Sequence, residues 1–118
     1  MAEDEKLVRN LARRILVQAG FTVLEAENGE EALELCKRHQ GPIHLLLTDM
    51  VMPKMSGPEL ARCIALLRRE IKVVFMSGYT EHSILEPEML ELAKTFIQKP
   101  FSPGALVQKI WETLTPAS

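Results

Sequence analysis

The chain has 118 residues, of which 47% are apolar and 25% are charged, and this balance predicts one globular domain over 1–118. The net charge of −2 and the pI near 5.9 exclude a strongly basic surface for nucleic acid or a membrane. The chain has no membrane-length apolar stretch, the start MAEDEK is no signal peptide, and there is no CxxC motif. We therefore expect a reducing, cytoplasmic setting.

Apolar residues at helical spacing alternate with short apolar runs along the whole chain. In chain order we expect a helix over 5–19, a strand over 21–26, a helix over 30–39, a strand over 43–49, a helix from Ser56 to about Arg69, a strand over 72–76, a helix over 82–93, a strand over 95–98 and a helix from Ser102. Short links between alternating strands and helices predict a three-layer α/β fold, with a parallel sheet covered by helices on both faces.

One strand is missing from this pattern. A doubly wound domain needs an apolar strand of about five residues before the first helix, but only Met1 and Ala2 precede the acidic pair Glu3-Asp4. Its absence would leave ladder hydrogen bonds unpaired in a marginally stable fold. Three explanations stay open: the chain is a fragment or starts at the wrong methionine, a neighbouring chain supplies a strand, or the flanking strands close up and displace Glu3 and Asp4.

Polar residues follow the predicted strands at their carboxyl ends, where ligands bind in parallel sheets. They are Asp49 after LLLT, Ser77 after VVFM, Lys99 after TFIQ, and Glu3 and Asp4 where the missing strand would end. Taken singly, each has a simpler explanation as a turn former, a first-turn helix acid or a solvated loop residue. Their coincidence at four strand ends favours a shared site.

The chemistry of this set of residues can be argued from their types. Three carboxylates held together repel each other unless a cation neutralises them. Oxygen ligands without histidine or thiol favour a hard cation, so we expect Mg²⁺, with Mn²⁺ as the second candidate. Asp49 is then a candidate nucleophile toward phosphorus, and Ser77 and Lys99 supply donors and positive charge for the phosphoryl oxygens.

In this order the motifs resemble the receiver domain of two-component response regulators. They are Glu3-Asp4, TDMVMPKMSG around Asp49, MSGYT with Ser77, and KPF from Lys99 to Phe101. The resemblance covers nearly the whole chain, and the wording LLLTDMVMP, VVFMSGYT and FIQKPFSPGAL is most similar to receivers at the C-terminus of hybrid sensor histidine kinases. It implies a flavodoxin-like sheet of order 2-1-3-4-5, with the first strand largely missing here.

The resemblance also implies a role for each residue of the site. These roles are phosphoacceptor for Asp49, contacts to the phosphoryl oxygens for Ser77 and Lys99, and Mg²⁺ binding by Glu3 (through water), Asp4, Asp49 and the backbone carbonyl of Val51. The bond between Lys99 and Pro100 would be cis.

The resemblance also implies a conformational switch at the rim of the sheet that these strand ends form. On phosphorylation Ser77 would move toward the phosphoryl group and Phe96 would rotate inward, although plain core packing explains Phe96 equally well. Tyr79 would lie near the rim and influence dephosphorylation by limiting water, or would simply be partly buried. Phosphorylation adds roughly −1.5 to −2 charges, so it need only favour a state that is already populated.

Three functional hypotheses follow. The first is a phosphoacceptor receiver that takes a phosphoryl group from a sensor histidine kinase or histidine phosphotransfer protein, catalysing only its own phosphotransfer and autodephosphorylation. The alternative is a degenerate receiver that acts as an unphosphorylated interaction module, and a dimer or strand exchange is expected if another chain supplies the missing strand. A phosphatase acting on a separate substrate is disfavoured, because such enzymes commonly carry a second acid where Val51 stands.

Overall fold

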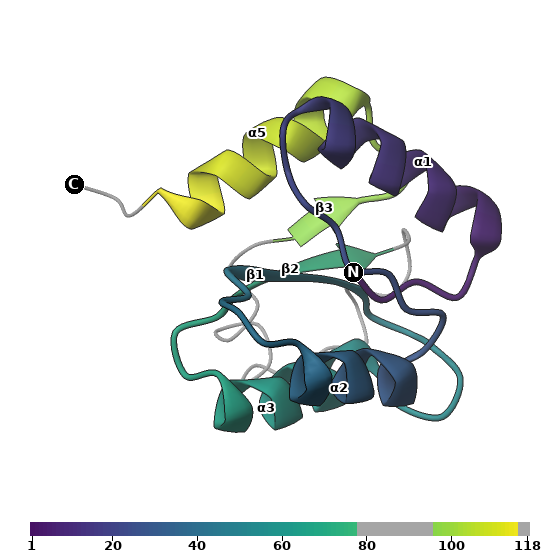
Figure 1. The fold of residues 1–118 in the computed structure, drawn as a ribbon. Coiled ribbons are helices and arrows are strands. Elements are labelled where there is room, and N and C mark those ends of the chain that lie inside the picture. Colours follow the sequence, from purple (N-terminus) through teal and green to yellow (C-terminus); the bar gives the residue numbers. More distant parts are fainter. Residues whose placement is uncertain (78–95, 116–118) are drawn as a thin grey trace.

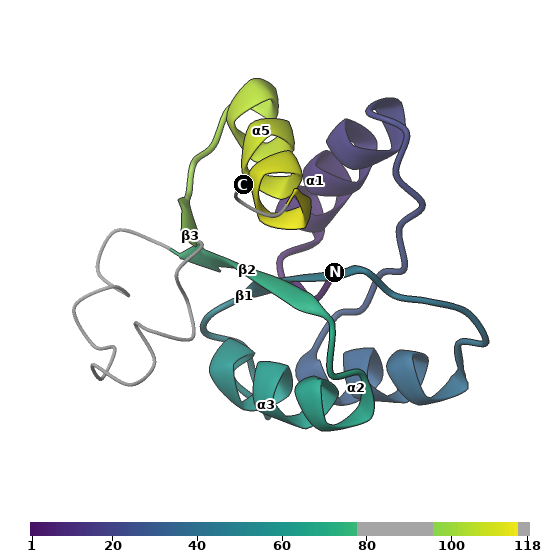
Figure 2. The same cartoon turned by 90° about the vertical axis from the view of Figure 1, so that its left-hand side faces the viewer.

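The fold is a parallel sheet between two layers of helices. A computed structural model describes residues 1–77 and 96–115. The strands β1 (Leu45–Asp49), β2 (Lys72–Ser77) and β3 (Phe96–Gln98) pair in that order, all parallel. Helices α1 (Lys6–Gln18) and α5 (Pro103–Leu114) cover one face, and α2 (Gly29–Arg38) and α3 (Gly57–Leu67) cover the other (Figures 1 and 2). This is the α/β architecture that the alternating pattern predicts.

Helices α2, α3 and α5 each begin directly after a residue whose side chain caps them. The side chains of Asn28, Ser56 and Ser102 each accept a hydrogen bond from a backbone N–H three residues on, at 2.9, 3.2 and 3.1 Å. Each such cap satisfies one of the N–H groups that the first turn of a helix leaves unpaired. The expected helix over 82–93 and the first residue of the expected strand over 95–98 lie outside the described residues. No helix within 1–77 and 96–115 is long and apolar enough to cross a membrane.

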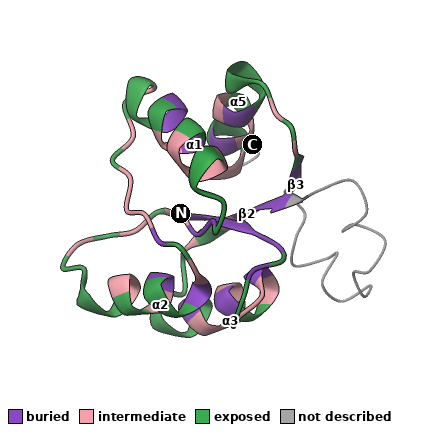
Figure 3. Cartoon of the chain, turned by 90° about the vertical axis from the view of Figure 1, so that its right-hand side faces the viewer, coloured by how far each residue is buried: buried purple, intermediate pink, exposed green. Residues whose placement is uncertain are grey.

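The sheet is buried on both faces, which explains the continuous apolar run in β1. Leu47 packs in the core beneath α1 and α5, and its neighbour Leu46 packs in the core above α2 and α3. Successive side chains of a strand point to opposite faces, so both positions must be apolar when helices cover both sides. Figure 3 shows this buried band between two helical layers whose outer faces are exposed.

The first strand survives as a remnant centred on Ala2. This residue forms parallel bridges to Ala26 on one side and Thr48 on the other. Its N–H donates to the Leu47 carbonyl at 2.9 Å, and its carbonyl accepts from the Asp49 N–H at 2.9 Å. The order is therefore the 2-1-3-4-5 of a flavodoxin-like sheet. Because Ala2 holds the flanking segments apart, the explanation in which they close up and displace the acidic pair is wrong for this structure.

The expected strand over 21–26 is also corrected by this remnant. Only Ala26 pairs as a bridge, and residues 21–25 form no strand. A strand needs a partner along its length, and the remnant offers one only from Met1 onward: the Met1 nitrogen donates to the Leu24 carbonyl at 2.7 Å. The short partner, rather than the sequence FTVLEA itself, limits this strand.

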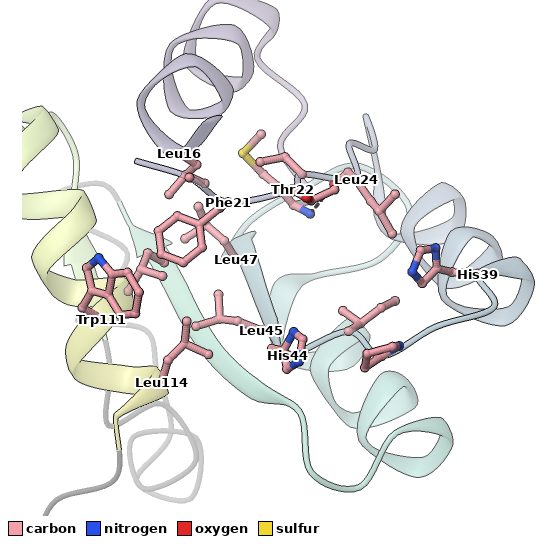
Figure 4. Close-up of a pocket in the computed structure, with 16 residues that line it drawn as sticks. Leu16, Phe21, Thr22, Leu24, His39, His44, Leu45, Leu47, Trp111 and Leu114 are labelled. Atoms are coloured by element: carbon pink, nitrogen blue, oxygen red, sulfur yellow. Dashed lines mark hydrogen bonds between the residues drawn. The ribbon is translucent and has the colours of Figure 1, made fainter. Parts of the chain in front are cut away.

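An apolar groove of about 670 Å³ lies beside β1, next to the remnant strand. It runs between residues 21–24 and 43–45, and the ends of α1 and α5 close it with side chains that include Leu16, Trp111 and Leu114 (Figure 4). The alternation of hydrogen bonds along β1 directs the Leu45 carbonyl and the Leu47 N–H into this groove. The sheet is thus complete at its carboxyl end and open at its amino end.

Candidate functional site

The carboxyl ends of three parallel segments of the sheet bring three charged residues together. Asp49 is the last residue of β1, Lys99 directly follows β3, and Glu3 directly follows Ala2 in the remnant strand. The Lys99 Nζ lies 2.8 Å from Glu3 Oε1 and 3.0 Å from Asp49 Oδ1. The side chains of Glu3, Asp49 and Lys99 are only 0%, 5% and 16% exposed, so this ion-pair triad is largely shielded from water.

Asp4 adds a third carboxylate on the solvent side. Oxygen atoms of Glu3, Asp4 and Asp49 all lie within 4.8 Å of one another, and Asp4 is exposed where the other two are buried. Such a cluster of oxygen donors, open on one side, has the chemistry that a hard divalent cation requires. The residues present therefore fit a Mg²⁺ site.

The electrostatics of the triad centre on Asp49. Burial raises the pKa of Asp49 to about 7, with the neighbouring charge of Glu3 acting in the same direction and Lys99 opposing it. Burial would lower the pKa of Lys99, but its hydrogen bonds to Glu3 and Asp49 outweigh burial and raise it. Lys99 therefore stays protonated and is the positive charge that holds the two buried carboxylates together.

The backbone around Asp49 is held by a tight return of the following loop. The N–H of Met50 donates to Asp49 Oδ1 at 3.0 Å, and the N–H of Gly57 donates to the Met50 carbonyl at 2.8 Å. A Cβ on Gly57 would collide with the Asp49 carbonyl oxygen, so only glycine allows this approach. Gly57 was not predicted from the sequence as a site residue. The one local feature that could have drawn attention to it was its position directly after the capping residue Ser56.

The remaining predicted residues lie around the triad. Ser77 ends β2 beside Gln98, and its side chain lies outside the described part of the structure, as does the whole of Tyr79. Val51 is 51% exposed in the loop after Asp49.

Two further predictions concern β3 and the residues that directly follow it. Phe96 packs on Phe75 with ring centroids 6.0 Å apart. The peptide bond between Lys99 and Pro100 is cis.

Comparison with known families identifies this arrangement. The model of the "Response regulator receiver domain" matches residues 1–111. The chain belongs to the response regulator receiver family. As a receiver it is a component of two-component signalling, in which receivers accept phosphoryl groups and partner with histidine kinases or phosphotransfer proteins.

Individual relatives support the same assignment. The chain is 37% identical over 97% of its length to sensor kinase CckA of Brucella abortus, of which it spans only 12%. It is 32% identical to response regulator receiver protein CpdR of the same organism, with 99% of this chain and 96% of that protein covered. The crystal structure of the receiver domain from the hybrid histidine kinase CckA superposes with a TM-score of 0.79 at 32% identity, covering 97% of this chain and 95% of the other. The resemblance to receivers of hybrid kinases is thereby confirmed.

Proposed function

We propose that Asp49 accepts a phosphoryl group from a phosphohistidine on a histidine kinase or phosphotransfer protein. The observation that carries this proposal is the buried triad, in which Lys99 lies 3.0 Å from the Asp49 carboxylate at the ligand-binding end of the sheet. A structural salt bridge needs no third carboxylate beside it. Asp4, exposed and within reach of both buried acids, completes a set of three carboxylates that a bound cation would neutralise.

The proposed reaction is an in-line transfer. A carboxylate oxygen of Asp49 attacks phosphorus, the N–P bond of the phosphohistidine breaks, and its electron pair stays on the imidazole nitrogen. The product is an acyl phosphate on Asp49. In this step the Lys99 ammonium leaves its contact with the carboxylate and binds a phosphoryl oxygen, and the Ser77 hydroxyl is the second donor.

The acidic cluster would hold Mg²⁺ during the transfer, with Mn²⁺ as a substitute. Its ligands would be Asp4, Asp49 and the backbone carbonyl of Val51, with Glu3 binding through water. The cation would supply positive charge for the carboxylates and for the phosphoryl oxygens. Asp49, whose pKa is raised to about 7 without metal, would then be an anion at neutral pH, because a neighbouring cation favours the ionised form of a carboxyl group.

The output of the reaction is a change in partner contacts. The added charge draws Ser77 toward the phosphoryl group, and Phe96, which packs on Phe75 at the edge of the sheet, rotates inward. Tyr79 limits the access of water to the acyl phosphate. We assign residues 1–118 to a single receiver domain that works in the cytoplasm, where ATP-dependent kinases make phosphohistidine.

Intact-mass spectrometry after incubation with Mg²⁺ and a small acyl-phosphate donor tests this proposal. We expect the mass of one phosphoryl group on the wild type, none on Asp49→Ala, and none when Mg²⁺ is chelated. Glu112→Gln, which changes an exposed acid on α5, is the matched control and should be phosphorylated like the wild type. A wild-type protein that binds Mg²⁺ but gains no mass would overturn the proposal and favour the unphosphorylated interaction module.

A further inference from the structure

Arg9, in the first turns of α1, makes a contact that the phosphoacceptor chemistry does not explain. Its Nη1 donates a hydrogen bond of 2.9 Å to the backbone carbonyl of Glu3. Its Nε lies 3.9 Å from Glu25 and its Nη2 lies 3.9 Å from Glu27, and the side chain is only 11% exposed. One guanidinium thus joins the acidic pair to the segment beside the remnant strand.

The position of this contact matters because the acidic pair is weakly anchored from the sheet side. Ala2 is the only residue before Glu3 that bridges both neighbours in the described structure. The Glu3 N–H donates to Ala26 at 3.1 Å, and after that the main chain leaves the sheet for α1. The Glu3 carbonyl, at the point of departure, is held by Arg9. The planar fork of an arginine suits such a junction, since it can bind several acceptors in one fixed geometry.

We propose that Arg9 is a positioning residue for the acidic cluster. By fixing the main chain between Glu3 and Asp4, it keeps their carboxylates within reach of Asp49 and so sets the affinity of the site for Mg²⁺. This inference rests on the proposed metal-dependent function, and it assigns a role to a side chain that touches neither the metal nor the phosphoryl group. Partners that orient metal ligands from outside are worth about 10- to 100-fold in metal affinity.

Arg13 provides a matched control one turn further along α1. Its Nε lies 3.4 Å from Glu25, a shorter distance than the 3.9 Å between Arg9 Nε and Glu25, but the Arg13 side chain is 41% exposed. Among the described residues, it is Arg9 and not Arg13 that donates a side-chain hydrogen bond to the Glu3 carbonyl. If ion pairing to Glu25 were the purpose of both arginines, loss of either would have the same consequence.

Mg²⁺ titration by calorimetry, well below the unfolding temperature, separates these roles. We expect Arg9→Met, which keeps the apolar stem, to bind Mg²⁺ about tenfold more weakly than the wild type. Arg9→Lys should recover part of this loss, because the charge remains without the fork. Arg13→Met should stay within about twofold of the wild type. Equal affinities for wild type and Arg9→Met would overturn the proposal, since a merely structural arginine changes the unfolding temperature and leaves binding by the folded protein unchanged.

Hydrogen exchange in metal-free protein gives a second, independent readout. The Glu5 N–H donates to Glu3 Oε2 at 3.2 Å, and this bond depends on the same stretch of main chain. We expect faster exchange at Glu5 in Arg9→Met and unchanged exchange in Arg13→Met. Unchanged exchange in both variants would overturn the positioning role even if phosphorylation proceeds. A wild type that gains no phosphoryl group, with the exchange difference present, would count against the proposed function alone.

Discussion

The two ends of β1 face opposite conditions in the same sheet. At the carboxyl end, Asp49 is paired with Lys99 at 3.0 Å and lies beside Glu3 and Asp4. At the amino end, Leu45 borders an apolar groove of about 670 Å³, and within residues 1–77 and 96–115 β2 is the only strand paired with it there. The remnant strand at Ala2 separates these two environments.

Few contacts place the acidic pair at the carboxyl end of the sheet in this structure. Two ladder hydrogen bonds to Ala2 place Glu3 at the rim, and Arg9 holds the main chain on the other side. The rim is stabilised by electrostatics that are local to it, whereas the groove lacks the apolar burial that normally dominates a central strand. Changes at the rim should therefore act through charge and pH, and changes at the groove through burial.

The largest expected effect comes from removing the positive charge of Lys99 at the carboxyl end of the sheet. Lys99→Ala leaves the buried carboxylates of Glu3 and Asp49 without compensation, and we expect a loss of about 3–5 kcal/mol in unfolding free energy at pH 8. The loss should shrink at low pH, where a carboxyl group takes up a proton instead. Urea denaturation of wild type and Lys99→Ala at pH 8 and at low pH measures the loss and its decrease. Lys54→Ala removes an exposed pair with Glu30 at 3.7 Å and should change stability by less than about 1 kcal/mol.

The pH dependence of stability is the next test of the rim. The pKa of Asp49 is raised from 3.8 to about 7 in the folded protein, chiefly by burial. Between these pH values Asp49 binds more protons in the folded state than in the unfolded state, so its contribution to the unfolding free energy of metal-free protein should fall as pH rises. Denaturation curves across this range should give a more negative slope of unfolding free energy against pH for the wild type than for Asp49→Asn, and saturating Mg²⁺ should reduce this difference. An identical slope in Asp49→Asn would show that Asp49 titrates normally.

Filling the groove should change the opposite end of the sheet. A four-residue apolar extension ahead of Met1 can pair with the open ladder and bury its side chains on both faces. We expect a gain on the order of 2 kcal/mol after the entropy of ordering the extension is subtracted. Denaturation followed by the fluorescence of Trp111, which lines the groove, measures this gain. A Gly-Ser extension of the same length should give no gain, and equal stability of both variants would mean that the groove does not accept a strand.

The last comparison concerns the close approach at Gly57. Gly57→Ala forces the loop away from the Asp49 carbonyl, and we expect a loss of about 1–3 kcal/mol together with slower phosphorylation. Gly104→Ala in α5 meets nothing within 4 Å and should stabilise by up to about 1 kcal/mol. Thermal unfolding of both variants tests the contrast. Destabilisation of similar size in both would mean that the approach to Asp49 has no special importance.

The sequence by itself determined the elements and the residue types at the rim. Local signals were sufficient there: the caps Asn28, Ser56 and Ser102 set helix starts, and the apolar run before Asp49 identified a strand buried on both faces. Such signals depend on neighbours a few residues apart, so they can be read without knowing the fold.

Tertiary structure alone decided how the sheet begins and which contacts hold the site. Three observations depend on segments that the fold brings together. Ala2 lies between Ala26 and Thr48, and residues 21–25 form no strand. Arg9 donates a hydrogen bond to the Glu3 carbonyl. Strand pairing is a property of two segments rather than of one, so FTVLEA could not reveal that its partner was too short. The raised pKa of Asp49 is likewise a result of burial beside Glu3, which no single stretch of sequence contains.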